Sequence, residues 1–442
     1  MVKVVPFKAF RYDPNVVGDL SKVVAPPYDV IKGKKVDEIQ GMSLYNVAWV
    51  TKNKPQDRDT PENNQYTRAR EIITGWFKEG ALKQDPKECF YIYGQNFKVD
   101  DRELFRFGFI GLLELEEFGK NLPKDAPFAG VLQHEETLPK DILDRLSLLR
   151  QTHVQEGQIF VIYPDHEGKV DSILERYMKQ KPAIDIYDAD GVRDRIWVVD
   201  GPEDTHRISE IMSEKYVIIA DGHHRYKTAL AFRDENPQNA GAKFRMMTFV
   251  NIANPGLVIL PTHRLVQNLE YFSGAELLSK ASEHFIIKDF KTKRGMFNLM
   301  DKMFKASKHA FGLFMNDGKY YCMTLKDESA MDAILPDKSH QLRKLDVSIL
   351  HSLLLDRILG INKEKLLHGT MTGGGYVVYI KGIGDAVDES IEMVQKGAQA
   401  VFFMNPTRIG EVEGVARNFE CMPQKSTFFH PKVWTGFTFN RV

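Results

Sequence analysis

Two neighbouring stretches of the chain alternate between aromatic and other side chains. Residues 90–97 form the first stretch, and Phe105, Phe107 and Phe109 mark the second, with Asp100-Asp101 between them. A repeat of two residues places alternate side chains on one face of a strand. The pattern therefore predicts a β-hairpin with one aromatic face.

Upstream of this hairpin the repeat changes to that of a helix. Tyr66, Ala69, Ile73 and Trp76 recur every three or four residues and fall on one helical face. From residue 138 onward, helical and strand repeats follow one another. The elements expected here are a helix through Leu149, a strand over 159–163, a helix over 170–178, a hairpin turning at Asp190-Gly191 and a helix over 205–212. Such a mixture predicts an α+β (mixed α/β) fold.

One strand-to-helix connection is rich in polar side chains. Residues 216–220 are a short apolar run typical of a buried strand, and residues 226–232 have the pattern of a helix. Between them lies Asp221-Gly222-His223-His224-Arg225. This polar string therefore stands where a buried strand meets a helix N-terminus.

The last part of the chain has the same mixed pattern. The expected elements are a pair of neighbouring strands over 244–252 and 257–266, helices over 274–285 and 293–306, a hairpin turning at Asn316-Asp317-Gly318, a helix over 347–359, a strand over 400–404, and a loop over 422–427 before a terminal strand. With 442 residues the chain exceeds the usual size of one hydrophobic core. We expect a first unit over 1–270 and a mixed α/β second unit over 271–442.

Composition narrows the function classes. Sixty basic and sixty acidic residues cancel, so no overall field attracts the chain to nucleic acid or an anionic membrane. Cys89, Cys322 and Cys421 lie far apart, which predicts neither a disulfide framework nor a cysteine zinc site. No apolar run reaches bilayer length, and the N-terminus lacks a signal-peptide core. These features predict a cytoplasmic protein that binds neither DNA nor membranes.

The polar string has the chemistry of an anion site. Gly222 lets the backbone turn sharply, and the helix that follows presents unpaired N–H groups with partial positive charge. Arg225 adds a guanidinium that can bind phosphate, and His223 or His224 can donate a hydrogen bond or move a proton. The structural alternative is that Asp221 caps the helix, the two histidines are satisfied polar groups and Arg225 pairs with a carboxylate.

The stretch from Val217 to Leu230, VIIADGHHRYKTAL, resembles the phosphate-binding motif of the ParB/sulfiredoxin superfamily, which includes free-serine kinases. The wider chain resembles the domain of unknown function 1015 family, often labelled SpoOJ/ParA/ParB/repB-like. The segments that carry this second resemblance are Ala25 to Val30, His134-Glu135, Leu260 to Arg264 and Pro423 to Phe429. The resemblance implies a ParB/sulfiredoxin-like core with additional α/β elements.

Departures from these relatives limit what the resemblance implies. Sulfiredoxins need a cysteine where this chain has His223, and ParB proteins carry a further arginine where it has His224. The Asp-Gly-His-His-Arg string is similar to that of free-serine kinases. It implies phosphoryl transfer from a nucleotide, ATP or ADP with Mg²⁺, to a hydroxyl of a small metabolite. In this interpretation Asp221, His223 and His224 are catalytic, and Gly222, Arg225 and Tyr226 bind phosphate.

Three further segments carry candidate site residues. His134 and Glu135 lie in a loop before a helix, where Glu135 is a further catalytic candidate or simply a solvated residue. The stiff Pro26-Pro27 pair positions Tyr28 and Asp29 for a substrate contact or a structural turn. His263 and Arg264 follow an apolar strand, where open α/β sheets often place ligand residues.

The C-terminal loop contains Lys425, Ser426 and Thr427 between Pro423 and Phe428. One cation beside two hydroxyls suits a phosphate. We therefore expect this loop to return to Asp221–Arg225 and complete the phosphate site, the alternative being a structural pin for the last strand.

Two other functions fit the same residues. A metal-dependent phosphohydrolase would use Asp221, His134, Glu135, His263 and one of the paired histidines as ligands. Adjacent helical histidines diverge by about 100°, however, and no H-x-H or H-E-x-x-H spacing is present, so we expect no protein-held metal. A non-catalytic nucleotide-sensing module is the third possibility.

Overall fold

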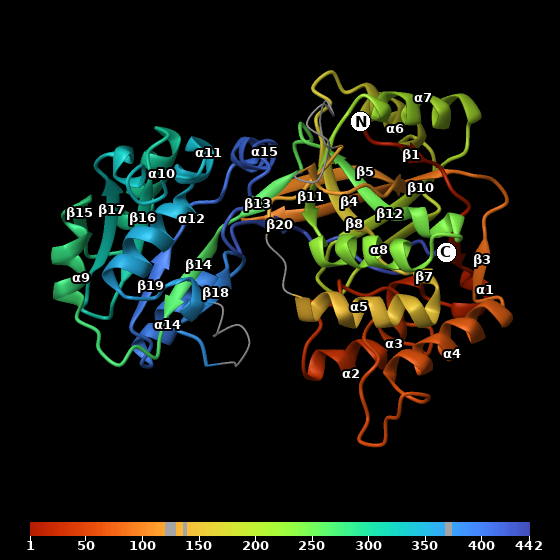
Figure 1. The fold of residues 1–442 in the computed structure, drawn as a ribbon, viewed down its shortest axis with the longest axis horizontal. Coiled ribbons are helices and arrows are strands. Elements are labelled where there is room, and N and C mark those ends of the chain that lie inside the picture. Colours follow the sequence, from red (N-terminus) through yellow and green to blue (C-terminus); the bar gives the residue numbers. More distant parts are fainter. Residues whose placement is uncertain (120–129, 136–138, 367–373) are drawn as a thin grey trace. The chain divides into compact units, whose positions relative to one another are not determined.

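The computed structural model describes residues 1–119, 130–135, 139–366 and 374–442 (Figure 1). The chain packs as two compact units. The first contains the described residues up to 133, then 139–257 and 431–442. The second contains residues 134–135 and the described part of 258–430. The predicted domains, 1–270 and 271–442, stay a prediction, because a division by compactness does not show which segments fold independently.

A nine-stranded mixed sheet forms the centre of the first unit. Its order is β6-β11-β8-β12-β5-β4-β10-β9, and β1 joins it by pairing with β5. The strands are β1 (Val4–Val5), β4 (Phe90–Val99), β5 (Arg102–Glu114), β6 (Val131–Leu132), β8 (Ile159–Tyr163), β9 (Ile184–Tyr187), β10 (Arg193–Val199), β11 (Val217–Asp221) and β12 (Phe244–Asn251). Two small ribbons pair β2 (Phe10–Tyr12) with β3 (Leu82–Gln84) and β7 (Val154–Gln155) with β21 (Asn440–Arg441).

Helices cover both faces of this sheet. Figure 1 shows α6 and α7 on one side and α8 on the other, with α5 beneath α8 and α2–α4 beyond α5. The helices are α1 (Pro14–Val17), α2 (Lys34–Gln40), α3 (Ala48–Thr51), α4 (Gln65–Lys78), α5 (Pro139–Thr152), α6 (Lys169–Met178), α7 (Pro202–Ser213) and α8 (His223–Glu235). Because both faces are covered, the central strands are buried along nearly their whole length.

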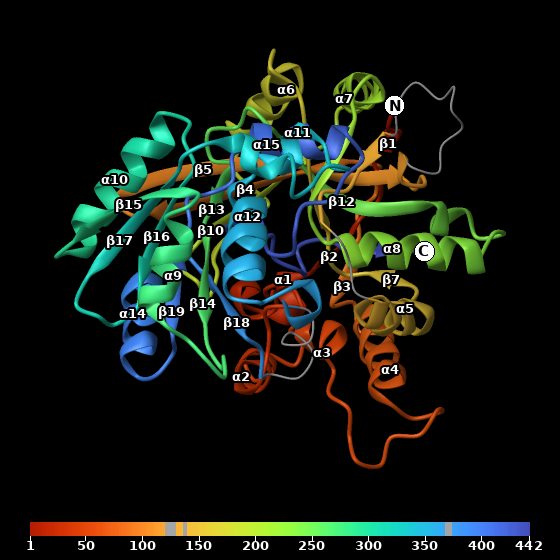
Figure 2. The same ribbon diagram turned by 60° about the vertical axis from the view of Figure 1, so that its left-hand side comes forward.

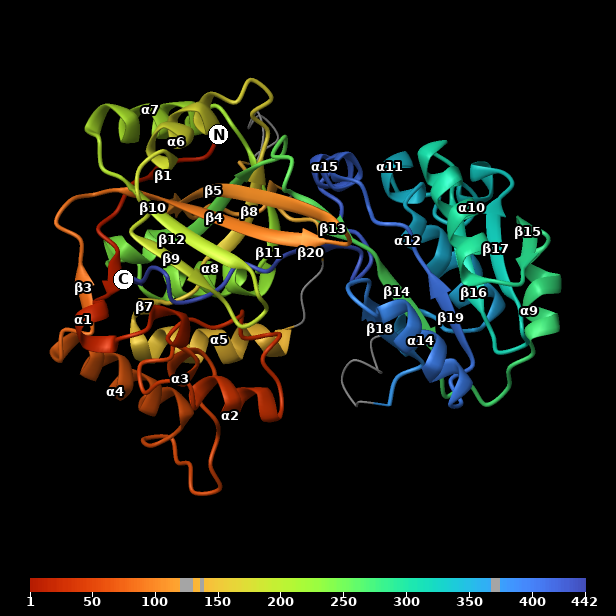
Figure 3. The ribbon, with the colours of Figure 1, turned by 180° about the vertical axis from the view of Figure 1, so that it is seen from behind.

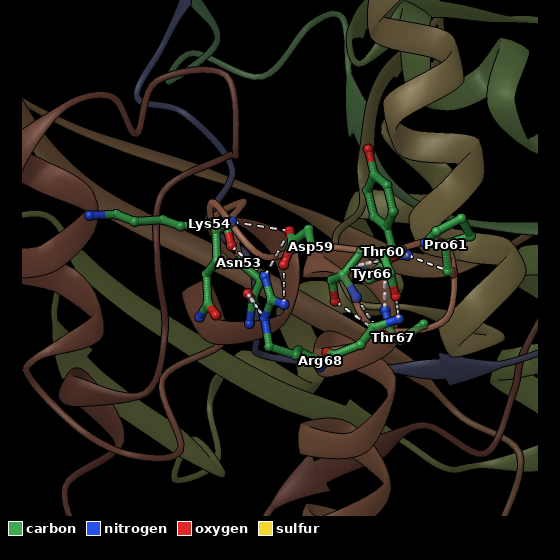
Figure 4. A network of polar contacts seen from close by, with 11 residues as sticks. Asn53, Lys54, Asp59, Thr60, Pro61, Tyr66, Thr67 and Arg68 are labelled. Atoms are coloured by element: carbon green, nitrogen blue, oxygen red, sulfur yellow. Dashed lines mark hydrogen bonds and ion pairs between the residues drawn. The ribbon is translucent and has the colours of Figure 1, made fainter.

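Local sequence explains how α4 begins. The Asn64 side chain accepts hydrogen bonds from the amides of Tyr66 and Thr67, and the Thr67 hydroxyl accepts one from the Asn64 amide. This capping box satisfies N–H groups that the first turn leaves unpaired. In Figure 4 the same network continues through Arg68, which binds Asp59 with its Nη1 at 2.6 Å and so ties the preceding loop to the helix.

The second unit is built on a six-stranded sheet of order β15-β17-β16-β19-β14-β18. Its strands are β14 (Thr262–Val266), β15 (Phe285–Phe290), β16 (Ala310–Phe314), β17 (Tyr320–Leu325), β18 (Val377–Lys381) and β19 (Ala400–Phe403). A separate ribbon pairs β13 (Val258–Leu260) with β20 (Phe428–His430). The helices are α9 (Gly274–Ala281), α10 (Lys293–Lys305), α11 (His340–Arg343), α12 (Asp346–Ile349), α14 (Ala386–Gln395) and α15 (Ile409–Arg417).

The alternating side chains of β16 show why both faces of this sheet are covered. Phe311 and Leu313 pack in one core with α9 and α12, whereas Ala310 and Phe314 pack in another with α10 and α14. Helix α12 continues directly into a π-helix, η5 (Leu350–Ile358), and the two read as one rod in Figure 2.

The α+β class is confirmed, and so are most predicted elements. β4 and β5 form the predicted hairpin around Asp100-Asp101, and β9 and β10 form the hairpin at Asp190-Gly191, seen together in Figure 3. Three expectations differ. The helix expected over 274–285 ends at Ala281, and Phe285 begins β15. Helix α8 begins at His223 rather than at 226, and the strands expected at 244–252 and 257–266 do not pair with each other. β12 joins the first unit's sheet, while β13 and β14 belong to the second unit.

Candidate anion-binding site

The polar string begins at a bulge in β11. Ile219 pairs with Val161 of β8, but the next pair is Asp221 with Phe160, so β11 has one extra residue at this point. Such a bulge bends a strand and redirects the side chains that follow it. Gly222 then adopts a left-handed conformation with φ 98°, which an L side chain rarely takes. Strand, bulge and glycine together turn the chain directly into α8.

The first turn of α8 has no side-chain cap. Gly222 occupies the N-cap position and supplies no hydrogen-bonding side chain, so Asp221 does not cap the helix. Uncapped amides carry the positive end of the helix dipole. One part of the structural alternative is therefore wrong, and the helix start keeps the electrostatic character that the anion hypothesis needs.

Asp221 joins two cations. Its carboxylate accepts a hydrogen bond from Lys432 Nζ at 2.8 Å and another from Arg225 Nη2 at 3.2 Å. Burial by itself raises the pKa of this carboxyl group, but Lys432 and Arg225 together hold it well below the usual range. Asp221 is consequently ionised at neutral pH. The other part of the structural alternative, pairing of Arg225 with a carboxylate, is present.

Arg225 lies folded over the glycine. Its Nη1 donates to the carbonyl oxygen of Gln158, and a Cβ placed on Gly222 would meet the Arg225 Nε at 3.0 Å. That Nε is buried and has no hydrogen-bond partner among the described residues. The guanidinium is thus anchored at both terminal nitrogens, while one donor stays unused beside the helix start.

More positive charge is buried close by. Arg245 is 5% exposed, donates from Nη2 to the carbonyl oxygen of Gly157 at 2.6 Å, and feels repulsion from Arg225. Burial lowers the pKa of Arg245 to about 10, so it is still charged at neutral pH. Arg106 is 2% exposed and interacts electrostatically with Asp221. Around the turn, the four cations Arg225, Lys432, Arg245 and Arg106 stand against three carboxylates: Asp221, Asp194, which acts on Arg106, and Glu156, which acts on Arg245.

The other residues of the string differ in exposure. His223 is buried, whereas His224 is partly exposed. Tyr226 is fully buried, and its hydroxyl donates to the carbonyl oxygen of Glu116 at 2.7 Å. Tyr226 therefore holds the helix start against the end of β5, a position that leaves its hydroxyl already bonded to the backbone.

A second group of predicted residues meets within the second unit. His134 is 1% exposed, and its Nε2 lies 2.9 Å from Thr427 Oγ1. The Lys425 amide donates to Glu135 Oε1 at 3.2 Å, and the Lys425 carbonyl oxygen accepts from Arg264 Nη2 at 3.0 Å. Residues far apart in the sequence thus converge, but the Lys425 contacts use its backbone.

Two neighbours in this group, Ser426 and His263, have structural partners. Ser426 Oγ bonds to the carbonyl oxygen of Pro423. His263 Nδ1 accepts the Met404 amide at 3.1 Å, and burial together with Arg264 lowers the pKa of His263 to about 4. A neutral, fully packed imidazole of this kind supports the strand register.

Tyr28 and Asp29 lie elsewhere in the first unit. The Tyr28 ring faces the Arg145 guanidinium at 4.3 Å and the Lys52 ammonium at 5.6 Å. Burial, followed by repulsion from Arg145, lowers the pKa of Lys52, which also interacts with Asp29. A cavity of about 140 Å³ adjoins this group, with Lys52 and Arg145 in its wall. The arrangement is a cation–π cluster.

The sequence of this chain matches a known protein family. A family model described as "Protein of unknown function (DUF1015)" matches residues 4–348. The chain belongs to this family. The matched part of the DUF1015 chain contains the Asp221–Arg225 turn, while Lys425 and Lys432 lie beyond it. No curated protein matches the chain.

Several solved structures are similar to the DUF1015 chain at low identity. A free serine kinase in complex with AMP is 12% identical, with a TM-score of 0.32, and the match covers 71% of this chain and 92% of that one. A conserved hypothetical protein from Pyrococcus furiosus is 11% identical, with a TM-score of 0.31 and coverages of 68% and 87%. SbnI with a C-terminal truncation, from Staphylococcus aureus, is 12% identical, with a TM-score of 0.30 and coverages of 71% and 80%. Likeness at this level assigns no role to individual residues.

Two features were not found in the described part of the DUF1015 chain: a group of metal-ligating side chains and a membrane-spanning helix. Among the described residues, no three His, Cys, Asp or Glu side chains gather in a way that could hold a metal ion. Within the same part of the chain, no helix has both the length and the apolar character needed to span a membrane.

Sequence reasoning missed three groups at the turn. Lys432 reaches Asp221, although Lys425 was the lysine expected to do so; Lys425–Thr427 belong to the second unit, and their approach to the turn stays a prediction. Gln158 and Arg245 also escaped notice. The only signal for Lys432 is its place in the same C-terminal segment. Gln158 directly precedes β8 and Arg245 lies in β12, and the pairing of β8 with β11 and β12 brings both to the turn.

Proposed function

We propose that this DUF1015 chain binds a nucleoside di- or triphosphate at the Asp221–Arg225 turn and transfers a phosphoryl group to a hydroxyl of a small metabolite. The observation that carries the proposal is the start of α8, where the N-cap Gly222 supplies no capping side chain, beside the buried guanidinium groups of Arg245 and Arg106. Helix amides and guanidinium groups are the usual protein ligands of phosphate. The resemblance of the motif to free-serine kinases supports transfer rather than binding alone.

In this proposal, the acceptor hydroxyl oxygen attacks the terminal phosphorus, the bond to the bridging oxygen breaks, and the shorter nucleotide leaves. The hydroxyl proton passes to a nearby base. Asp221 is a weak base because its pKa is held low, so its part is to position Arg225 and Lys432. His224, which is partly exposed, is the better acceptor. Mg²⁺ would enter with the nucleotide rather than be held by protein ligands, and would offset part of the phosphate charge.

Calorimetry with ADP and ATP tests the binding step. Arg225→Ala removes a charge-assisted contact of about 1.5–3 kcal/mol, so nucleotide affinity should fall about ten-fold or more. Arg233→Ala is the matched control, because it removes the same charge from the other end of α8, where Arg233 pairs with Glu117. Equal affinity in wild type and a folded Arg225→Ala variant would show that the turn does not bind the nucleotide.

Phosphorus NMR separates the two remaining functions. The protein is incubated with Mg²⁺, a nucleotide and a pool of small hydroxyl metabolites, and a new phosphomonoester signal identifies the acceptor. Nucleotide binding without any new signal would instead favour the sensing module. Release of inorganic phosphate that persists with a stoichiometric metal after chelation would favour the phosphohydrolase.

A further inference from the structure

A cavity of about 310 Å³ lies within the second unit. Its described lining contains no residue of the Asp221 turn. Its described walls come from the rod formed by α12 and η5, from β18, and from the segments around 335–342 and 421–424. This volume is at the lower end of the range of small-molecule sites, about 300–1,000 Å³. The cavity therefore has room for one small ligand.

Two polar atoms in the wall have no hydrogen-bond partner among the described residues. Ser348 Oγ and His351 Nε2 are buried and make no hydrogen bond with any described residue. The two side chains are three positions apart on one helical rod and so lie on the same face. Burial, together with Arg264, lowers the pKa of His351 well below its usual value, so the imidazole is neutral at neutral pH. Unsatisfied buried groups are costly, and a ligand atom would satisfy them.

A buried positive charge stands behind the same wall. Arg264 is 1% exposed and donates to the carbonyl oxygens of Thr262 and Lys425. It has no ion pair with a carboxylate among the described residues, and its Nε has no partner there. The Tyr379 ring, which lines the cavity, lies 5.4 Å from its guanidinium. A buried charge without a counter-charge favours an anion in the space beside it.

The rim and floor define the rest of the ligand. The described lining contains two exposed lysines, Lys338 and Lys363, and one carboxylate, Asp356. The floor is apolar, with Leu342 and Met422 both buried. Two orphaned hydrogen-bonding atoms match the two oxygens of a carboxylate better than the three oxygens and double charge of a phosphate. The walls suit an apolar body attached to that head.

We propose that this cavity is a binding site for a small carboxylic acid with an apolar body, which places its carboxylate toward Ser348, His351 and Arg264 and its apolar part toward Leu342 and Met422. The site is independent of the nucleotide chemistry proposed for the first unit. The rod that carries Ser348 and His351 is partly π-helical, a distortion that often occurs at functional sites.

Calorimetry with three probes of equal length tests the ligand class in the full chain: hexanoate, hexanol and hexylammonium. Hexanoate should bind at least about ten-fold more tightly than either other probe. Equal binding of hexanol, tighter binding of hexylammonium, or no binding of hexanoate at about 10 mM would each overturn the proposal.

Substitutions locate the site. His351→Leu should weaken hexanoate binding about ten-fold or more without lowering thermal stability, since it replaces an unpartnered imidazole by an apolar group of similar size. His340→Leu is the control, because His340 is exposed and outside the cavity lining, and it should bind hexanoate as wild type does. If His351→Leu fails to fold, Ser348→Ala replaces it as the test variant. Unchanged affinity in the folded test variant would overturn the assignment.

Discussion

The two units hold buried arginines in different ways. In the first unit, Arg225 pairs with Asp221, which also binds Lys432. In the second, Arg264 bonds to two backbone carbonyl oxygens and has no carboxylate partner in the part of the chain that the structure describes. A protein carboxylate already offsets charge at the turn, so an incoming anion must compete with it. At the cavity, an anion would not have to displace a carboxylate paired with Arg264 in the described part of the chain, and the carboxylate in the lining, Asp356, stands beside Lys338 and Lys363.

Removing the internal carboxylate should have the largest effect. Asp221→Asn leaves Lys432 and Arg225 without their shared counter-charge, and the Asp221 side chain is 20% exposed, so the first unit should lose about 2–3 kcal/mol of unfolding free energy. Urea unfolding followed by tryptophan fluorescence measures this change in the first unit, because all four tryptophans, Trp49, Trp76, Trp197 and Trp434, lie there.

Phosphate binding to Asp221→Asn tests whether Asp221 competes with an incoming anion. Inorganic phosphate should stabilise Asp221→Asn more than wild type, with an affinity gain of about ten-fold, because the anion no longer competes with Asp221. Asp185→Asn is a control, since Asp185 pairs with Arg193 at the surface. If phosphate stabilises both proteins equally, Asp221 and its cations form a structural ion pair and nothing more.

Acid should affect the second unit through His351. Above pH about 6.5 the imidazole is neutral in both the folded and the unfolded chain. Below that pH the unfolded chain takes up a proton that buried His351 does not, because its folded pKa is lowered. The wild type therefore loses stability as pH falls, by up to about 1.4 kcal/mol per pH unit from this group.

His351→Leu lacks this loss, so its stability relative to wild type should rise by about 1 kcal/mol between pH 7 and pH 5.5. Far-UV circular dichroism is the suitable probe, because the second unit contains no tryptophan. His263 titrates in both proteins and cancels from the difference. A stability difference that does not change with pH would mean that His351 is solvated in the folded protein.

Lys425→Ala should have the smallest effect on stability. Lys425 is exposed, and its hydrogen bonds with Glu135 and Arg264 are made by its backbone, so the free energy of unfolding should change by less than about 0.5 kcal/mol. If Lys425 serves the nucleotide site, nucleotide turnover nevertheless falls. Lys338→Ala provides a charge-matched comparison on the second unit. Wild-type turnover in Lys425→Ala would leave the loop a structural role.

Local patterns in the sequence were enough to predict elements but not partners. The alternation around Asp100-Asp101 identified β4 and β5, since a two-residue repeat depends only on neighbouring residues. The same reasoning wrongly joined β12 to the following strand, because pairing depends on which unit each strand enters. Helix α8 begins three residues before the expected position, 226, because Gly222 turns the chain and no residue in His223–Arg225 opposes a helix.

The sites show the same limit. Asp221, Gly222 and Arg225 were found because the chemistry lies within five consecutive residues. Lys432 is 211 residues from Asp221, and the cavity of the second unit collects side chains from four separated segments. Ser348 and His351 carry no motif in the sequence. Only the packing of their rod reveals that their polar atoms are buried and find no hydrogen-bond partner within the described ranges of the chain.

The return of residues 431–442 to the first unit has a consequence for synthesis on the ribosome. Lys432, which binds Asp221, and Pro431, whose carbonyl oxygen accepts from Arg106 at 2.6 Å, are translated after the whole second unit. In a nascent chain the Asp221 turn can therefore form before Lys432 is available. It lacks this partner while residues 258–430 emerge and fold. Asp221 consequently gains the positive charge of Lys432 only at the end of synthesis, when the C-terminal segment packs against the sheet of the first unit.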